Sequence, residues 1–161
     1  MVSREKDEAM MELAAKKAAD TMKRNIGGPF GATITRGDEI VCIESNRVLA
    51  NNDPTAHAEV TAIRKACEVL GTYDLSDCTI YCTGSPCPMC LGAIIWAGIK
   101  DVVISGLPED ADAIGFKDDF MYKFIQDKKC NDESVLKMRY VNRDIATQLY
   151  QHYTEMTGVI Y

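Results

Sequence analysis

The chain has 161 residues, of which 47% are hydrophobic and 26% are charged, a composition typical of globular proteins that form one compact domain. Its 24 acidic and 18 basic residues give a net charge of −6, which argues against nucleic-acid partners because these require a basic surface. The charged N-terminal segment is not typical of a secretion signal, and the longest apolar run, residues 91–99, is too short to cross a membrane. We therefore expect a cytoplasmic protein of one domain, residues 1–161, that acts on a small molecule.

Periodic apolar residues predict the elements of the first half of the chain. A helix is expected over residues 5–24, because apolar side chains recur there every four positions. Two short apolar segments, 32–35 and 39–43, flank a loop with a glycine and predict a β-hairpin. A second helix is predicted over 54–70, with Asp53 as its N-cap.

The second half of the chain alternates strands with helices. The expected order is strand 78–82, a helix from Cys87 to the residues before Gly98, strand 101–105, helix 119–127, strand 135–141 and helix 144–156. Strands separated by helices imply crossover connections and a partly parallel sheet with helices on both faces. The sequence therefore predicts an α/β fold, a three-layer α/β/α domain around a central five-stranded mixed sheet.

The cysteines suggest a site rather than a disulfide framework, because there are seven of them, an odd number. Cys87 and Cys90, in the stretch "PCPMC", are the only two separated by two residues. This spacing occurs in redox pairs, in structural zinc sites and in catalytic metal sites. Both cysteines are expected at the beginning of a helix, where they point the same way and where the helix dipole favours thiolates. Their position alone leaves a redox pair and a metal site open.

Histidine discriminates between these possibilities. His57 lies in "DPTAHAEV", near the predicted beginning of the second helix, and Glu59 follows two residues later. Residues two apart are about 200° apart around an ideal helix, so these two side chains can converge only in an irregular first turn. Ligands of open α/β sheets bind at strand ends, where the beginnings of both helices would meet. His57, Cys87 and Cys90 would then give Zn²⁺ three ligands and leave a fourth position for water, as in catalytic zinc sites.

The order His-x-Glu followed by Pro-Cys-x-x-Cys is the signature of zinc deaminases that act on bases. Zinc lowers the pKa of its bound water toward about 7, and a nearby carboxylate that does not bind the metal can carry the protons. We assign this catalytic role to Glu59 and expect one zinc ion per chain. The reaction would replace an amino group on a heterocyclic ring by oxygen and release ammonia. A non-catalytic thiol or zinc module is the alternative.

Two stretches, "NDPTAHAEVTAIR" at 52–64 and "PCPMCLGAI" at 86–94, closely resemble the cytidine deaminase superfamily. With "GGPFGA" at 27–32, "GFKDD" at 115–119 and a terminal tyrosine, the chain is most similar to guanine deaminases of the bacterial type, over essentially its whole length. The resemblance implies a cytidine-deaminase-like fold and the conversion of guanine to xanthine and ammonia.

The resemblance also implies substrate contacts and a partner chain. Asn46 would hydrogen-bond the purine, Asp118 would accept from its N–H groups, and Phe30 would contact the base. Guanine deaminases of this type exchange C-terminal segments within a homodimer. Residues 144–161 would therefore be swapped, and Tyr161 would reach the site of the partner chain.

One position departs from the guanine deaminase pattern. Ser85 precedes the Pro-Cys pair where the guanine group carries glutamate, and serine at that place is a feature of fungal cytosine deaminases. Cytosine, or a nucleoside such as guanosine or cytidine, is therefore an alternative substrate. The tRNA adenosine deaminases are a more distant alternative, which the negative net charge disfavours.

Overall fold

The computed structural model describes residues 4–127, 132–156 and 158–160. The chain divides into two compact units, Met1–Asp118 and Asp119–Tyr161. The first unit contains the sheet and the second contains two helices, and each is described by itself.

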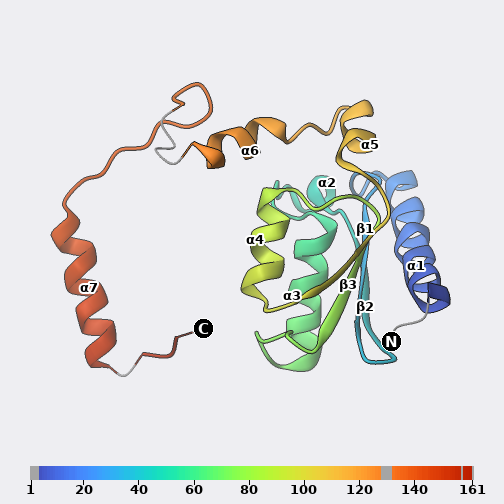
Figure 1. Ribbon diagram of the computed structural model, residues 1–161, viewed down its shortest axis with the longest axis horizontal. Helices are drawn as coiled ribbons and strands as arrows, with labels where there is room; N and C mark the ends of the chain where they lie inside the picture. The colour runs from blue at the N-terminus through green and yellow to red at the C-terminus, as the bar shows by residue number, and fades with distance from the viewer. Residues whose placement is uncertain (1–3, 128–131, 157, 161) are drawn as a thin grey trace. The chain divides into compact units, whose positions relative to one another are not determined.

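A mixed sheet of four strands forms the centre of the first unit (Figure 1). In chain order, the strands are β1 (Gly31–Arg36), β2 (Glu39–Ser45), β3 (Cys78–Cys82) and β4 (Asp101–Ile104). They lie in the order β2-β1-β3-β4. β1 pairs antiparallel with both β2 and β3, whereas β3 and β4 pair in parallel. The predicted hairpin is confirmed, and parallel pairing among the described strands is confined to the last two.

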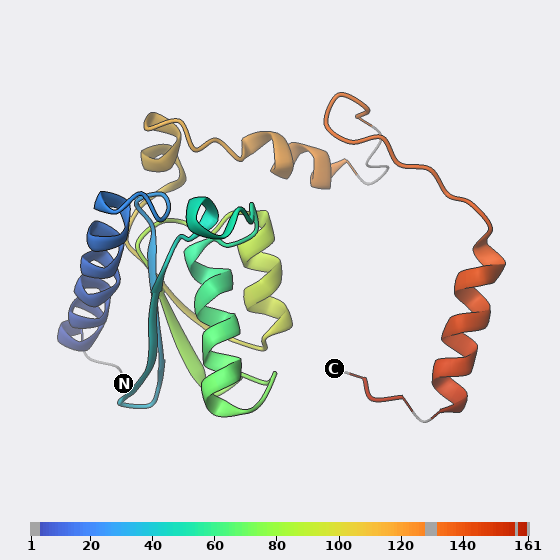
Figure 2. The same ribbon diagram turned by 180° about the vertical axis from the view of Figure 1, so that it is seen from behind.

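Helices cover both faces of this sheet (Figures 1 and 2). α1 (Arg4–Lys23) packs on one face, and α3 (Ala58–Leu70) and α4 (Pro88–Trp96) lie side by side on the other. The first five residues of β1 are all buried, which requires cover on both faces because successive side chains of a strand point to opposite sides. The predicted mixed sheet flanked by helices is therefore confirmed.

The hydrophobic core lies between the sheet and the pair α3 and α4. Ile34 of β1 and Ile80 of β3 are fully buried in it, at equivalent positions of paired strands. α3 contributes alanines at every fourth position, Ala58, Ala62 and Ala66, which are also fully buried. Because these side chains are small, the helix can pack closely against the strands.

The opposite face of the sheet is closed by α1 at short range. Ala14 and Ala18 of the helix are buried, and a Cβ atom on Gly31 of β1 would overlap the carbonyl oxygen of Ala14. The buried hydroxyl of Thr33 donates a hydrogen bond to the carbonyl oxygen of Met10 at 3.2 Å. Small residues on both elements thus set the spacing of this layer.

Two short helices of the first unit were not predicted. α2 (Val48–Asn51) lies directly after β2, where the sequence indicates an irregular polar loop. α5 (Pro108–Ala113) lies after β4 and begins with a proline, whose fixed backbone angle suits the first helical position. The side chain of Asp110 accepts a hydrogen bond from the backbone N–H of Leu107 at 2.8 Å, which caps this helix.

The second unit contains α6 (Asp119–Gln126) and α7 (Arg143–Glu155), and both confirm predicted helices to within one residue. Neither helix has a buried residue. Among the described helices of the chain, none combines the length and the apolar character needed to cross a bilayer.

The predicted strand over 135–141 is wrong, and the sheet has four strands rather than five. The backbone N–H groups of Val135 and Leu136 donate to the carbonyl oxygen of Asp132 at 3.0 and 3.1 Å, as in a turn. A strand is stable only where a neighbouring strand supplies hydrogen bonds and one face is covered. The apolar and aromatic residues of this segment are typical of a strand. Such a composition does not show whether a neighbouring strand is present to pair with it.

Candidate active site

Several loops meet at one end of the sheet, because β1 begins where its antiparallel neighbours β2 and β3 end. The backbone N–H of Asn46, just after β2, donates to the carbonyl oxygen of Phe30 at 2.9 Å. The N–H of Gly31 donates to the hydroxyl of Thr83, just after β3, at 2.9 Å. The loops that lead into α3 and α4 also start at this end. The stretches that contain His57 and Cys87 therefore lie here.

α3 begins at Ala58, four residues later than predicted, so Asp53 is not its N-cap. A carboxylate oxygen of Asp53 instead accepts hydrogen bonds from the backbone N–H and the hydroxyl of Thr55, at 2.8 and 2.7 Å, and this builds a turn before the helix. His57 takes the N-cap position with an extended backbone, φ −63° and ψ 160°. The predicted 200° separation from Glu59 therefore does not apply, because only Glu59 lies within the helix.

Cys87 and Cys90 lie at the beginning of α4, as predicted. Cys87 is the N-cap residue, with φ −69° and ψ 170°, and Pro88 follows at the first helical position. Cys90 lies in the first turn and is fully buried. Both α3 and α4 thus begin with a potential metal ligand at the N-cap.

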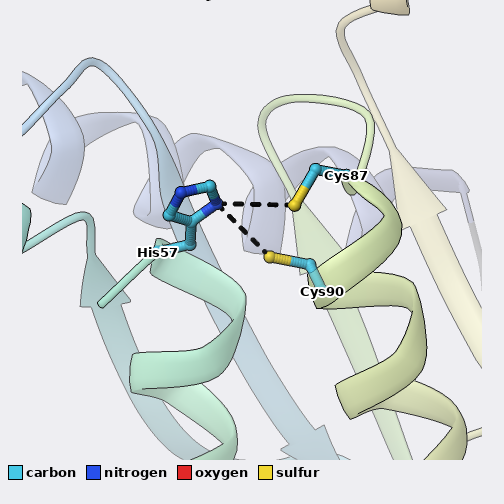
Figure 3. Close-up of side chains that lie close together, drawn as sticks. All are labelled: His57, Cys87 and Cys90. Atoms are coloured by element: carbon cyan, nitrogen blue, oxygen red, sulfur yellow. Dashed lines mark hydrogen bonds between the residues drawn. The ribbon is translucent and has the colours of Figure 1, made fainter. Parts of the chain in front are cut away.

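The three side chains His57, Cys87 and Cys90 converge (Figure 3). The Nδ1 atom of His57 lies 3.6 Å from the sulfur of Cys87 and 3.5 Å from the sulfur of Cys90. Bond lengths of about 2.3 Å to sulfur and 2.0–2.1 Å to nitrogen place these donor atoms about 3.6 Å apart around a tetrahedral zinc ion. The group therefore fits zinc in donor type and in spacing.

The three side chains shift one another's pKa values. A hydrogen bond from Cys90, and a second contact with His57, lower the pKa of Cys87 to about 4. The hydrogen bond to Cys87 and burial raise the pKa of Cys90, while the hydrogen bond to Cys87 raises the pKa of His57. One sulfur is thus already favoured as thiolate, which is the form that binds metals.

Glu59 lies beside this group, in the first turn of α3. The residue is only 7% exposed. Burial raises the pKa of its carboxyl group, and interaction with Cys90 opposes this rise. Acidic residues are rarely buried to this degree in a domain of this size, so Glu59 is a candidate for chemistry rather than for solubility.

Asn46 is buried at the same end of the sheet, and its carbonyl oxygen Oδ1 is already occupied. The backbone N–H of Gly28 donates to Oδ1 at 3.2 Å and that of Val48 donates at 3.1 Å. Two donors at one atom identify it as the oxygen of the amide. The amino group of Asn46 is then the part of the side chain that can serve a ligand, as a donor.

Phe30 is half-buried, and Phe116 packs against it edge to face, with the ring centroids 5.0 Å apart and the ring planes at 89°. Sequence reasoning missed Phe116, although it belongs to the quoted "GFKDD" stretch, where Gly115 adopts φ +97°. Asp118 lies two residues further on and is half-buried. Tyr161 lies outside the described residues.

Four more cysteines have free thiols in the described part of the chain: Cys42, Cys67, Cys78 and Cys82. Burial raises the pKa of Cys42 and of Cys78 to about 11, so both thiols stay protonated at neutral pH. Both belong to the hydrophobic core and not to the candidate site. Cys130 lies outside the described residues.

Comparison with known proteins identifies the kind of site. Residues 4–106 match the cytidine and deoxycytidylate deaminase zinc-binding region. The chain is 48% identical over 128 residues to guanine deaminase from Bacillus subtilis (strain 168), across 80% of this chain and 81% of that protein. It is 27% identical over 150 residues to the tRNA-specific adenosine deaminase of the same organism, across 93% and 90%.

A solved structure agrees with these relatives. The X-ray structure of guanine deaminase from Bacillus subtilis superimposes with a TM-score of 0.86 at 42% identity, over 92% of this chain and 93% of that one. The fold is therefore the α/β fold of cytidine deaminases, and the chain is a homologue of guanine deaminase. Because the matched region contains the histidine and both cysteines that the fold brings together, the chain belongs to the zinc-binding family of cytidine and deoxycytidylate deaminases.

Proposed function

We propose that this chain is a zinc-dependent aminohydrolase that converts guanine and water into xanthine and ammonia. The observation that carries the proposal is the buried carboxylate of Glu59 beside the group of His57, Cys87 and Cys90. The 48% identity to a guanine deaminase favours guanine among the possible bases.

The three converging side chains would hold the metal, with Nδ1 of His57 and the sulfur atoms of Cys87 and Cys90 as donors. A zinc ion bound there supplies a water molecule that is acidic enough to be deprotonated near neutral pH. Three protein donors leave a position for that water, which distinguishes a catalytic site from a structural site with four ligands.

Glu59 is the proton carrier in this proposal. Its carboxylate takes one proton of the attacking water and delivers it to the adjacent ring nitrogen of the base. It then takes the proton of the new hydroxyl group on the ring carbon and passes it to the departing amino group. A C–O bond forms at the ring carbon that carries the amino group, the C–N bond breaks, and ammonia leaves. The burial of Glu59 supports this role, because a carboxylate shielded from bulk water keeps its proton for the substrate.

Recognition of the purine would involve Asn46, Asp118 and Phe30. The free amino group of Asn46 donates to an acceptor atom of the base, since Oδ1 is held by Gly28 and Val48. The carboxylate of Asp118 accepts from N–H groups, and the ring of Phe30 contacts the base. A wrong base leaves these polar groups unpaired, which costs about 1–3 kcal/mol for each buried group.

We also propose that the protein is a homodimer in which residues 144–161 are exchanged and Tyr161 completes the partner's site. The exposure of the second unit supports this. Ile145, Leu149 and Tyr150 of α7 are exposed, and so is Ile160 in the tail. Apolar side chains in this number favour cover by another protein surface, and a second copy of the chain is always available.

The test is ammonia release from purified, zinc-loaded protein with a panel of substrates: guanine, guanosine, cytosine, cytidine, adenine and tRNA. Guanine should be the fastest, with xanthine as the product. If cytosine is deaminated faster, the guanine assignment is wrong, and Ser85 was the residue that indicated a cytosine deaminase. If tRNA is the substrate, the net negative charge was misleading and the similarity to tRNA-specific adenosine deaminase was the better guide.

A further inference from the structure

The segment after β4 runs beside the end of β3, at the end of the sheet that carries the candidate active site. The backbone N–H groups of Ser105 and Gly106 donate to the carbonyl oxygens of Cys82 and Thr83, at 3.1 and 2.9 Å. α5 follows, and the N–H of Phe116 then donates back to the carbonyl oxygen of Ala111 at 3.0 Å. These bonds fix the path that carries Phe116 to the site end.

Two glycines make room for the aromatic pair that results. A Cβ atom on Gly28 would lie 3.2 Å from the ζ carbon of Phe116, and one on Gly84 would lie 3.1 Å from the Cδ1 atom of Phe30. Both distances are shorter than comfortable packing, so a larger residue at either position would displace a ring. The glycines therefore accommodate both rings at this place.

Each of these glycines is tied to a candidate site residue. The N–H of Gly28 donates to the side chain of Asn46 at 3.2 Å. Gly84 lies three residues before Cys87, on the loop from β3 to α4. Phe116 is thus in contact with the segment that positions the proposed purine donor, and with Phe30 beside the metal-binding loop.

Phe116 is nevertheless 49% exposed, although its ring is held edge to face on Phe30. About half of the surface of this residue therefore stays available for a flat ligand while Phe30 holds the ring. Aromatic side chains stack on nucleobases without hydrogen bonds. Such stacking strengthens the binding of a planar base but does not discriminate between one base and another.

We propose that Phe116 is a further base-binding residue, whose ring is held by Phe30 and covers the base in the bound state. The proposal rests on the proposed function, because it requires a nucleobase substrate. A phenyl ring carries no proton, so Phe116 contributes to substrate affinity and not to proton transfer.

The experiment compares Phe116→Ala and Phe116→Tyr with Ile114→Ala. Ile114 lies on the same segment and is 59% exposed, so its replacement controls for loss of apolar surface from the segment. Phe116→Ala should raise KM for guanine roughly 5- to 150-fold, the range for loss of one base–aromatic stack, with kcat much less affected. Phe116→Tyr should restore KM, and Ile114→Ala should leave it unchanged.

A binding measurement separates this role from a folding effect. Guanine is titrated into zinc-loaded protein that carries Glu59→Gln, with and without Phe116→Ala, and the second change should weaken Kd by the same factor as KM. Equal zinc content in both proteins shows that the metal-binding group is intact. The proposal is overturned if KM and Kd are unchanged, or if Ile114→Ala has the same effect as Phe116→Ala. Failure of the wild-type protein to deaminate guanine would instead overturn the proposed function, a separate result.

Discussion

The backbone of Gly31, at the beginning of β1, lies against the carbonyl oxygen of Ala14 in α1 so closely that a Cβ atom on Gly31 would overlap that oxygen. The backbone of Gly31 is part of β1 and the carbonyl group of Ala14 is part of α1. Neither can move without shifting the strand or the helix. The contact therefore sets the distance between α1 and the sheet.

Gly31→Ala should destabilise the protein by about 1–3 kcal/mol, the usual cost of forcing an extra methyl group into a filled interior. The measurement is chemical unfolding followed by circular dichroism. Gly92→Ala is the matched control, because a Cβ atom on Gly92, inside α4, meets no atom within 4 Å. That change should stabilise the protein by about 0.5–1 kcal/mol, since alanine is the better helix former. Equal effects of the two changes would show that the close contact with Ala14 does not limit the packing.

Removal of a proposed metal ligand should empty the site without unfolding the chain. His57→Ala and Cys90→Ser should each reduce bound zinc from about one ion per chain to near zero, because a site with three protein donors tolerates no loss. Elemental analysis after dialysis gives the zinc content. Cys67→Ser is the control, since this thiol lies on α3 outside the metal-binding group. Zinc retained by Cys90→Ser, or a disulfide between Cys87 and Cys90 in freshly purified protein, would favour the redox alternative.

Glu59→Gln should keep zinc and bind guanine but lose turnover by at least about 10²–10⁴-fold, the usual contribution of one general acid–base group. The amide preserves size and polarity and cannot carry the proton. Steady-state ammonia release measures the loss. Glu68→Gln, an exposed glutamate of the same helix paired with Lys65, should have wild-type activity. A Glu59→Gln enzyme with most of its activity would remove this carboxylate from the mechanism.

Deletion of residues 159–161 should raise KM or abolish activity and leave the zinc content intact, if the tail completes the partner's site. Within the described tail, the hydroxyl of Tyr153 donates to the carbonyl oxygen of Val159 at 2.9 Å, and its ring occupies the space that a side chain on Gly158 would need. α7 thus gives the tail a defined direction. The assay is activity against guanine, together with the molecular mass in solution.

Mixing the tail-deleted chain with a Glu59→Gln chain should restore part of the activity. In the hybrid dimer, one site has an intact Glu59 and receives an intact tail from its partner. The control is the same mixture with the tail also deleted from the Glu59→Gln chain, which should stay inactive. A fully active truncated protein, or a strictly monomeric one, would contradict the exchange.

Most regular elements of the first unit could be predicted from the sequence. Their buried apolar residues recur with the period of a helix or of a strand. Ala58, Ala62 and Ala66 of α3 and the alternating core residues of β1 and β3 are examples. The beginning of α3 could not be predicted in this way. Asp53 and Pro54 are typical of a helix start, but Asp53 serves a turn with Thr55 instead, and only the tertiary structure decides between the two uses.

The metal-binding group could be predicted because the spacing of its residues is specific. The contact of Phe30 with Phe116 could not, since 86 positions of chain and an unpredicted helix, α5, separate the loops that meet. Residues 135–141 show the opposite failure. Their side chains are typical of a strand, yet the described structure gives them no neighbouring strand. Whether a neighbour is present depends on how the whole chain folds and not on the segment itself.

The position of His57 and Cys87 at the two helix N-caps has a thermodynamic consequence. They are 30 residues apart, and the loop between them contains α3 and β3, which supply much of the core. In the unfolded chain nothing holds the two residues together, so an ion that needs both of them binds the folded state alone. Since the site forms only on folding, each tenfold rise in free zinc above its dissociation constant adds about 1.4 kcal/mol to the free energy of unfolding. The thermal stability of this protein should therefore follow the zinc concentration of its surroundings.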